Sequence, residues 1–365
     1  MTAERDSSSS VRIHWHRSWD PNLESRRVAW EVALENERLR RFCTSQFQIA
    51  REDVPPMSSF DTLFEGDKPF VVDGVLASSL QELELDVNSN QSSLNSNMDC
   101  SGQDKIACNG LVKMGSCVLI TDTYHASIDV LMKTRNYSEK EAIKVITTAV
   151  DIAKKVAASY SRKIHVVGSI GPYGVVLRNR SGHSVPDVSE NAVKKYYDRQ
   201  MNAMLSTGLE SYCIETTPTL KEAKMALDVW KSQPNSLGKN LWISFSCKDG
   251  QFTHGGDHFY DVVHNLSAHP DLTAIGINCT NPSHLLELVR LAYPHANGKP
   301  FVVHPRHSDL SNLENNDSDQ SSENTFRDYV NTIPELFKLN VRLFLGCCRE
   351  NDRHVNEIAK TVKEL

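Results

Sequence analysis

The sequence predicts a (β/α)8 barrel preceded by an extra N-terminal helical segment. From residue 69 onward, short apolar runs alternate with amphipathic helical stretches, which is typical of parallel strands joined by helices. The apolar runs are hydrophobic on both faces, as strands covered by helices must be. There are eight such runs, the strand number of a closed barrel of about 250 residues. A doubly wound open sheet is the alternative that this pattern leaves open.

Each predicted strand is short and rich in β-branched or aromatic residues. The predicted strands are 70–72, 117–121, 164–168, 211–214, 241–246, 273–278, 300–304 and 341–346. The helices between them carry start signals. Ser138 with Glu141, and Thr219 with Glu222, each match a capping box, in which a hydroxyl and a carboxylate satisfy the first backbone amides of a helix.

The first 65 residues form a segment separate from the barrel. A tract of four serines at 7–10 predicts a disordered stretch, and an irregular apolar stripe over 24–49 predicts a helix. We interpret that helix as packed on the outside of the main domain, with a partner-binding arm as the alternative. The predicted domains are therefore 1–65, partly helical and partly disordered, and 66–365, the barrel.

Two polar insertions interrupt the alternation. Residues 85–105 are rich in Asn and Ser and predict a mobile loop, while residues 311–324 are acidic and of low complexity and predict a disordered insertion. One follows the first predicted strand and the other the seventh. Both would lie over the carboxyl ends of the strands, where barrel enzymes carry their active sites.

The composition excludes several classes of protein. A formal net charge of -6 without a long basic run argues against nucleic-acid binding. No apolar run approaches the roughly 20 residues that a membrane span needs, and the N-terminus lacks the apolar core of a signal peptide. We therefore expect a cytoplasmic protein. Its nine cysteines are scattered and odd in number, which argues against a disulfide framework.

Cysteines follow two of the predicted strands at the point where each strand ends. Cys347 and Cys348 come after the last strand, and Cys279 follows the sixth. If these strand ends meet, three thiolates converge, and three protein ligands with one open position are the arrangement of a catalytic zinc. The competing interpretation is that each thiol is a small buried core residue. The residues alone leave both interpretations open.

Other predicted strand ends are also polar. Asp73 and Glu215, after the first and fourth strands, could hold an ammonium group of a ligand, although a helix cap or a loop salt bridge explains either carboxylate alone. The glycine-rich run 168–174 does not have the spacing of a dinucleotide-binding or phosphate-binding loop. It predicts a close backbone turn around a substrate.

Taken together, these strand ends resemble the homocysteine S-methyltransferase family over roughly residues 69–362. The matching segments, in the family's order, are DGVLASSL from Asp73, TDTYHAS from Thr121, GSIGPYG from Gly168, IETTP from Ile214, WISFSCKDG from Trp242, GINCT from Gly276 and GCCR from Gly346. Each piece alone is weak, but the conjunction is specific. The family fold is a zinc-dependent (β/α)8 barrel, which agrees with the alternation described above.

The resemblance implies roles for individual residues. It implies Zn2+ as the cofactor, with the ligands Cys279, Cys347 and Cys348. It also implies a homocysteine-binding barrel in which two carboxylates contact the amino acid end of the substrate, an amide helps shape the metal site, and the 168–174 loop lines the pocket. The implied substrate-binding residues are Asp73, Gly74, Tyr124, Glu215 and Asn278.

The implied reaction is methyl transfer to L-homocysteine, a step of methionine biosynthesis. Zinc would hold homocysteine as a thiolate, the nucleophilic form of a thiol. The thiolate would attack a methyl group of a sulfonium donor, S-methylmethionine or S-adenosylmethionine. No catalytic residue is implied beyond the zinc-activated substrate thiolate. Betaine-using members share the zinc triad, so the triad does not identify the donor.

The sequence departs from the family pattern at two single positions and in one longer segment. Val75 replaces a glycine after the first strand, Leu345 replaces a glycine before GCC, and His304–Ser308 replaces the segment Tyr-Pro-Asn-Ser-Gly. These departures motivate a second hypothesis, a zinc-binding barrel that binds homocysteine or a related thiol without turnover, as a sensor or scaffold. A third hypothesis, a metal-free lyase or isomerase on the same fold, requires the thiols to be core residues.

Overall fold

The computed structural model describes residues 3–5, 11–13, 64, 69–72, 108, 112, 115–174, 189–306, 318–346 and 352–365. The chain divides into two compact units, Met1–Met57 and Ser58–Leu365. In the first unit, β1 (Ala3–Arg5) and β2 (Val11–Ile13) pair antiparallel. The predicted helix over 24–49 and the predicted loop over 85–105 lie outside the described residues.

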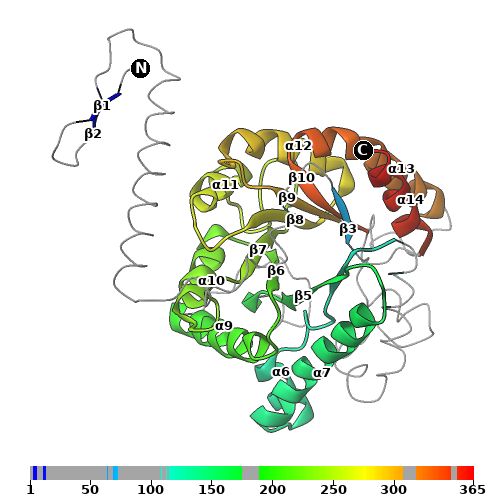
Figure 1. The fold of residues 1–365 in the computed structure, drawn as a ribbon. Coiled ribbons are helices and arrows are strands. Elements are labelled where there is room, and N and C mark those ends of the chain that lie inside the picture. The colour runs from blue at the N-terminus through cyan, green and yellow to red at the C-terminus, as the bar shows by residue number, and fades with distance from the viewer. Residues whose placement is uncertain are drawn as a thin grey trace. The chain divides into compact units, whose positions relative to one another are not determined.

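The second unit contains a closed barrel of parallel strands in the order β10-β3-β4-β5-β6-β7-β8-β9 (Figure 1). The strands are β3 (Phe70–Val72), β4 (Val118–Ile120), β5 (His165–Ile170), β6 (Ser211–Thr217), β7 (Asn240–Phe245), β8 (Ala274–Thr280), β9 (Phe301–Pro305) and β10 (Val341–Leu345). The last strand pairs with the first, with Leu343 opposite Phe70, and this pairing closes the ring. The prediction of a barrel is confirmed, and the open sheet is excluded.

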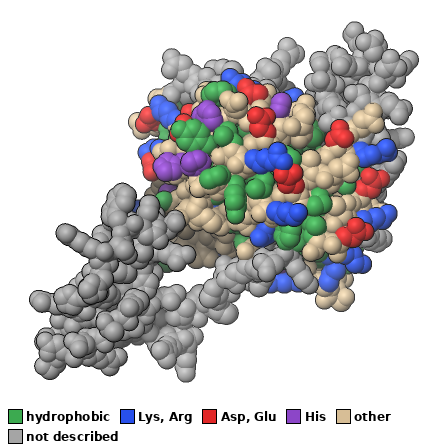
Figure 2. Space-filling model, turned by 90° about the horizontal axis from the view of Figure 1, so that it is seen from above, with side chains coloured by type: hydrophobic (Ala, Val, Ile, Leu, Met, Phe, Trp, Pro, Cys, Tyr) green, Lys and Arg blue, Asp and Glu red, His purple; other side chains and the backbone are tan. Residues whose placement is uncertain are grey.

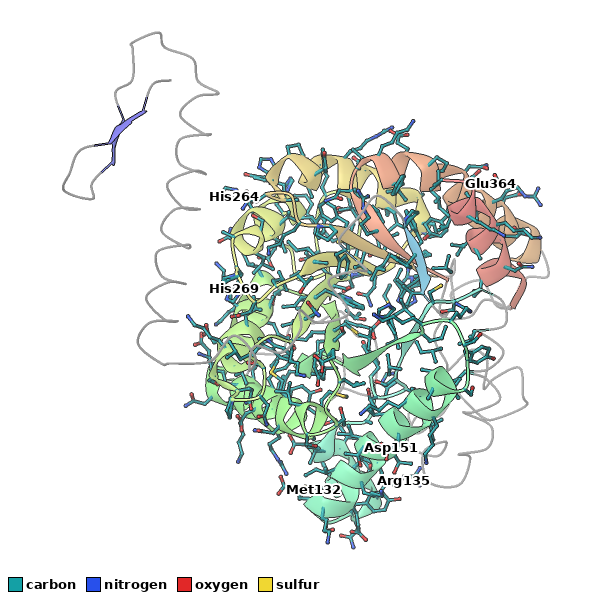
Figure 3. The ribbon with its side chains drawn as sticks, viewed as in Figure 1. Met132, Arg135, Asp151, His264, His269 and Glu364 are labelled. Carbon is teal, nitrogen blue, oxygen red and sulfur yellow. The ribbon has the colours of Figure 1, made fainter. Side chains whose placement is uncertain are left out.

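The helices form a ring outside the strands (Figure 1). They are α6 (Ile128–Arg135), α7 (Glu139–Ala158), α9 (Glu190–Leu205), α10 (Leu220–Ser232), α11 (Phe259–Ser267), α12 (Pro282–Ala292), the 3-10 helix η1 (Tyr293–His295), α13 (Ser318–Lys338) and α14 (Asp352–Lys363). Residues labelled on this outer ring include Met132 and Arg135 of α6, Asp151 of α7 and His264 of α11 (Figure 3). Among the described residues, no helix combines the length and the apolar character needed to cross a bilayer.

Two local predictions are wrong, and one is confirmed. Ser138 and Glu141 form the predicted capping box at the start of α7. Thr219 caps α10 by accepting from the backbone N–H of Glu222, but the Glu222 carboxylate bonds elsewhere, so the second box is half formed. Residues 318–324 of the predicted disordered insertion are the first two turns of α13, because the apolar side chains that follow bury this helix against the barrel. Residues 311–317 lie outside the described residues.

The hydrophobic core has two layers. The interior of the barrel is filled by one buried residue from each strand and a second from β10, namely Val72, Val118, Val167, Cys213, Trp242, Ala274, Val302, Leu343 and Leu345. Successive residues of a strand point to opposite sides, so the residues two positions further along also face inward. On β5, β6 and β9 these are Ser169, Glu215 and His304, all buried. The interior therefore changes from apolar to polar toward the carboxyl ends of the strands.

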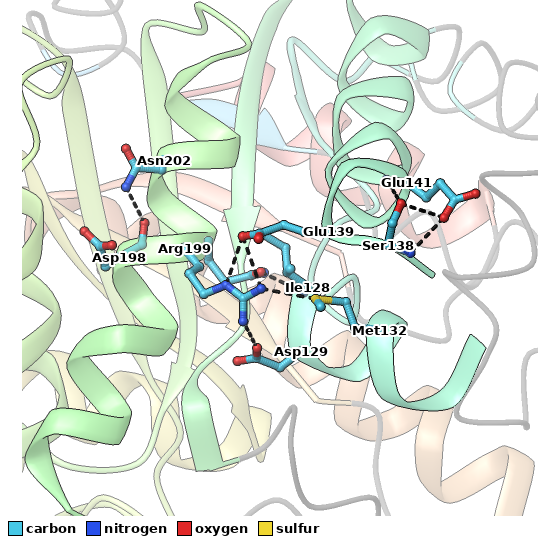
Figure 4. A network of polar contacts seen from close by, with 10 residues as sticks. Ile128, Asp129, Met132, Ser138, Glu139, Glu141, Asp198, Arg199 and Asn202 are labelled. Carbon is cyan, nitrogen blue, oxygen red and sulfur yellow. Dashed lines mark hydrogen bonds and ion pairs between the residues drawn. The ribbon is translucent and has the colours of Figure 1, made fainter. Parts of the chain in front are cut away.

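Polar contacts between α6, α7 and α9 fix the segment that follows β4. The Arg199 guanidinium on α9 forms ion pairs with Asp129 on α6 and Glu139 on α7 (Figure 4). Next to it, the buried Gln200 side chain accepts a hydrogen bond of 2.9 Å from the backbone N–H of Ile128. Exposed ion pairs contribute about 1 kcal/mol or less, so the buried amide is the stronger constraint on the position of this segment.

The surface carries charges of both signs. On the face shown in Figure 2, Lys and Arg side chains are interspersed with Asp and Glu, and histidines gather toward one side. Among the described residues on this face there is no extended basic patch of the kind that nucleic-acid binding requires.

Candidate functional site

A network of polar contacts joins the ends of four strands, β4, β5, β6 and β9, at the mouth of the barrel. Ser169 on β5 donates from its hydroxyl to Oε1 of Glu215 on β6. The other carboxylate oxygen lies 3.7 Å from Nδ1 of His304 on β9. Thr121, after β4, accepts from the backbone N–H of Ser169 at 3.0 Å and shares a hydrogen bond of 2.7 Å with the Thr123 hydroxyl. A carboxylate is thus held in a fixed orientation at the bottom of the barrel mouth.

A second network lies at the ends of β6 and β8. Asn278 accepts from the backbone N–H of Thr216 and donates to the Thr216 hydroxyl, each at 2.8 Å. The Thr216 hydroxyl in turn donates to Sγ of Cys279 at 3.8 Å. Asn278 and Thr216 are buried, and Cys279 is half-buried. The thiol therefore lies at the edge of the barrel mouth with hydrogen-bond donors directed at it.

The glycine-rich segment after β5 is held from outside by a buried carboxylate. Glu222 on α10 accepts from the backbone N–H of Tyr173 at 2.7 Å and from the Tyr197 hydroxyl at 2.8 Å. The Tyr196 hydroxyl donates to the carbonyl of Gly171 at 2.8 Å. Burial raises the pKa of Glu222 and raises that of Tyr197 well above its usual value, so the phenol remains a donor.

Tyr124 and His125 lie in the segment between β4 and α6. Their rings meet edge to face with centroids 4.6 Å apart. His125 is exposed to solvent. Partial desolvation by the surrounding protein lowers the pKa of His125, and the negative charge of Glu215 acts in the opposite direction.

The structure brings part of the predicted site together. Glu215, Asn278, Cys279 and Tyr124 all lie at the carboxyl ends of barrel strands or directly after them. The predicted residues Asp73, Gly74, Cys347 and Cys348, and the departing residue Val75, lie outside the described residues. Leu345 ends β10 as a buried interior residue.

Sequence reasoning missed three residues of these networks, namely Ser169, Thr216 and His304 as partners of the predicted residues. Ser169 and His304 could have been found from strand periodicity, since each lies two positions after an inward-facing valine. Thr216 carries no such signal, because it belongs to an irregularity in the strand pairing.

The donor chemistry near Cys279 fits a soft metal ion. Donors directed at a sulfur stabilise its thiolate form, and thiolate is the ligand that zinc prefers. Strands β8, β9 and β10 are neighbours, and Gly346, the residue directly before Cys347, follows the end of β10. Within the described part of the chain, no three His, Cys, Asp or Glu residues form a ligand cluster, and the remaining two predicted ligands are outside that part.

Other cysteines of the barrel have core environments. Cys213 lies inside the barrel and Cys247 is buried beside β7, where burial strongly raises the pKa of its thiol. A neutral buried thiol behaves as a small hydrophobic residue.

A closed barrel of parallel strands with polar side chains gathered at their carboxyl ends is the architecture of a (β/α)8-barrel enzyme. The family model described as homocysteine S-methyltransferase matches residues 70–362. The chain belongs to the homocysteine S-methyltransferase family, and it is a methyltransferase enzyme.

Curated relatives agree with this assignment, and a solved structure shares the fold. The chain is 27% identical over 305 residues to the homocysteine S-methyltransferase YbgG of Bacillus subtilis, covering 81% of this chain and 95% of that protein. It is 26% identical over 275 residues to the betaine-homocysteine S-methyltransferase of Drosophila melanogaster, covering 70% and 81%. The metallated form of the homocysteine methyltransferase MmuM from Escherichia coli shares the fold, with a TM-score of 0.70, 21% identity and coverage of 82% and 98%.

Proposed function

We propose that this protein transfers a methyl group from a sulfonium donor, S-methylmethionine or S-adenosylmethionine, to the thiolate of L-homocysteine, giving methionine. The observation that carries the proposal is Cys279. Its half-buried thiol lies at the end of β8, on the same mouth of the barrel as the buried carboxylate Glu215. One sulfur ligand and one ammonium-binding carboxylate on the same mouth match the two ends of homocysteine.

Family membership and strand topology support Cys279, Cys347 and Cys348 as the ligands of a zinc ion. Bound there, Zn2+ would supply a Lewis acid that keeps the homocysteine sulfur in its nucleophilic form at neutral pH. The protein's own residues would orient the two substrates and exclude water. Glu215, with Asp73, would hold the ammonium group, while Tyr124 and the loop fixed by Glu222 would form the pocket walls.

The test is methionine formation by purified, zinc-loaded protein, with S-methylmethionine, S-adenosylmethionine and betaine assayed in parallel and zinc measured on the same sample. Turnover with one donor would establish the reaction and identify that donor. Cys347→Ala is expected to abolish both zinc retention and methionine formation. The matched control is Cys117→Ala, because that thiol lies at the opposite end of the barrel, before β4. Full activity of Cys347→Ala would overturn the proposal.

A zinc-binding barrel without turnover is the second candidate, and His304 favours it. The buried imidazole lies 3.7 Å from the carboxylate that would receive the substrate ammonium, at a position where the family pattern has tyrosine. A neighbouring imidazole changes the space and the charge available beside that carboxylate. Tight zinc binding with no consumption of any donor would favour this candidate, and Val75→Gly would then test whether restoring the family residue restores turnover.

A further inference from the structure

Two residues at the barrel mouth have backbone conformations that side-chain-bearing residues rarely adopt. Thr216 has φ 60° and Cys279 has φ 49°, both in the left-handed region. Each coincides with a shift in strand register, between Ile214 and Thr217 on β6 and between Asn278 and Thr280 on β8. A β-branched residue in this region is strained, and such strain persists where surrounding contacts hold it. The two strand ends are therefore built irregularly at the same place.

The contacts that hold Thr216 come from the residue next to Cys279. Asn278 receives the Thr216 backbone N–H on Oδ1 and donates from Nδ2 to the Thr216 hydroxyl, both at 2.8 Å. All of these groups are buried, and an unmade hydrogen bond would cost about 1 to 3 kcal/mol for each group. The hydrogen bonds between Thr216 and Asn278 thus fix the irregular end of β6 to the irregular end of β8.

These hydrogen bonds also determine the direction of the Thr216 hydroxyl proton. Because the Thr216 oxygen accepts from Asn278, its own proton is directed to another acceptor. The acceptor is Sγ of Cys279, 3.8 Å away. The hydroxyl therefore presents its proton to the sulfur of Cys279.

We propose that Thr216 is a positioning residue that fixes the side chain of Cys279 through a hydroxyl hydrogen bond to its sulfur, with Asn278 holding the hydroxyl in place. The hydrogen bond itself does not depend on the proposed function, but its consequence does: if Cys279 is a zinc ligand, Thr216 orients that ligand. Partners of this kind orient metal ligands, and their loss weakens metal binding about 10- to 100-fold.

The experiment compares Thr216→Val, Thr216→Ser and Thr217→Val with the wild type. Valine keeps the β-branched shape and removes the hydroxyl, whereas serine keeps the hydroxyl. Thr217 is the matched control, because its buried hydroxyl has no hydrogen-bond partner among the described residues. The first readout is zinc release to a chromogenic chelator. Thr216→Val is expected to lose about tenfold in zinc affinity, while Thr216→Ser and Thr217→Val stay near the wild type.

A second readout requires neither zinc nor turnover. Metal-free, reduced protein is treated with iodoacetamide at one fixed pH, and modification of Cys279 is followed by peptide mass spectrometry. A hydroxyl donor stabilises the thiolate, which is the reactive form, so Thr216→Val is expected to slow the modification of Cys279 about fivefold. Melting temperatures of the variants separate this effect from a general loss of stability.

The outcomes distinguish this inference from the proposed function. A wild-type protein that retains no zinc overturns the proposed function, and the iodoacetamide comparison then still decides the role of Thr216. Zinc release and modification rates of Thr216→Val equal to the wild type would overturn the inference. So would a Thr216→Ser variant that behaves like Thr216→Val, or a Thr217→Val variant that shows the same loss.

Discussion

Ser169 on β5 donates a hydrogen bond from its hydroxyl to the buried carboxylate of Glu215 on β6. The second oxygen of that carboxylate faces His304 on β9. Glu215 is therefore held between two inward-facing side chains from separate strands. A carboxylate held in this way is pre-organised, so a cationic substrate group binds it without first ordering the side chain.

Glu215→Gln is expected to raise the KM for homocysteine about ten- to hundredfold, because the amide keeps the shape but loses the charge that pairs with an ammonium group. The contact is remote from the sulfur, so kcat should change less than KM. Steady-state kinetics at saturating donor measure this. The control is Glu210→Gln, a change at the opposite end of β6, where the carboxylate pairs with Lys239 at the surface. Equal KM values for both variants would contradict the prediction.

Glu222→Gln and Glu222→Leu should differ in stability. Glutamine keeps an acceptor for the backbone of Tyr173 and the hydroxyl of Tyr197, whereas leucine leaves both donors unsatisfied. We expect Glu222→Leu to lose about 2 to 4 kcal/mol of unfolding free energy and Glu222→Gln much less, as measured by urea denaturation. Similar losses in both variants would mean that the carboxylate does not hold the loop.

Acid titration should also separate the Glu222 variants. Burial raises the pKa of Glu222, so the folded protein binds this proton more tightly than the unfolded chain does. The contribution of Glu222 to the unfolding free energy therefore becomes more favourable as the pH falls from above the raised pKa toward 4.5. Glu222→Gln has no such proton and should lose this part of the pH dependence.

Gly276→Ala tests the packing of the barrel interior. A Cβ at Gly276 on β8 would lie 2.9 Å from Cβ of Ser244 on β7, closer than carbon atoms approach without displacement. The strands are paired at this position, so neither residue has room to move away. We expect a loss of about 1 to 3 kcal/mol in denaturant titrations. The double variant Gly276→Ala/Ser244→Gly should recover part of the lost unfolding free energy. If it recovers none, the clash with Ser244 is not the cause of the loss.

His165 should make the folded state sensitive to acid. Burial, together with the neighbouring charge of Lys163, lowers the pKa of this imidazole to about 4 from an ordinary 6.5. The unfolded chain therefore binds the proton more tightly between these pH values, and stability falls as the pH drops from 6.5 toward 4.

The measurement is the melting temperature from pH 7 to pH 4 for the wild type and His165→Gln. The variant is expected to show a shallower decline than the wild type. His264→Gln is the control, because that histidine is exposed on α11. A decline as steep in His165→Gln as in the wild type would show that other groups govern the acid response.

The sequence by itself determined the barrel and much of its mouth. Each strand of the barrel is covered on both sides, so it must be apolar on both faces, and each covering helix must be amphipathic. Both requirements are visible locally in the spacing of apolar residues along the sequence. The polar residues at the predicted strand ends placed Glu215, Asn278 and Cys279 at the mouth. Eight strands predicted a barrel but left an open sheet possible, and only the pairing of β10 with β3 excludes the open sheet.

Only the tertiary structure decided which polar groups are partners. Thr216 and Asn278 are 62 positions apart in the chain, and their reciprocal hydrogen bonds depend on register shifts in two strands that no local pattern records. Glu222 matched a capping box in sequence, yet burial beside Tyr197 directed its carboxylate to the loop after β5. Capping and periodicity are local and can be predicted from the sequence, whereas buried polar pairing depends on which strand ends the closed barrel brings together.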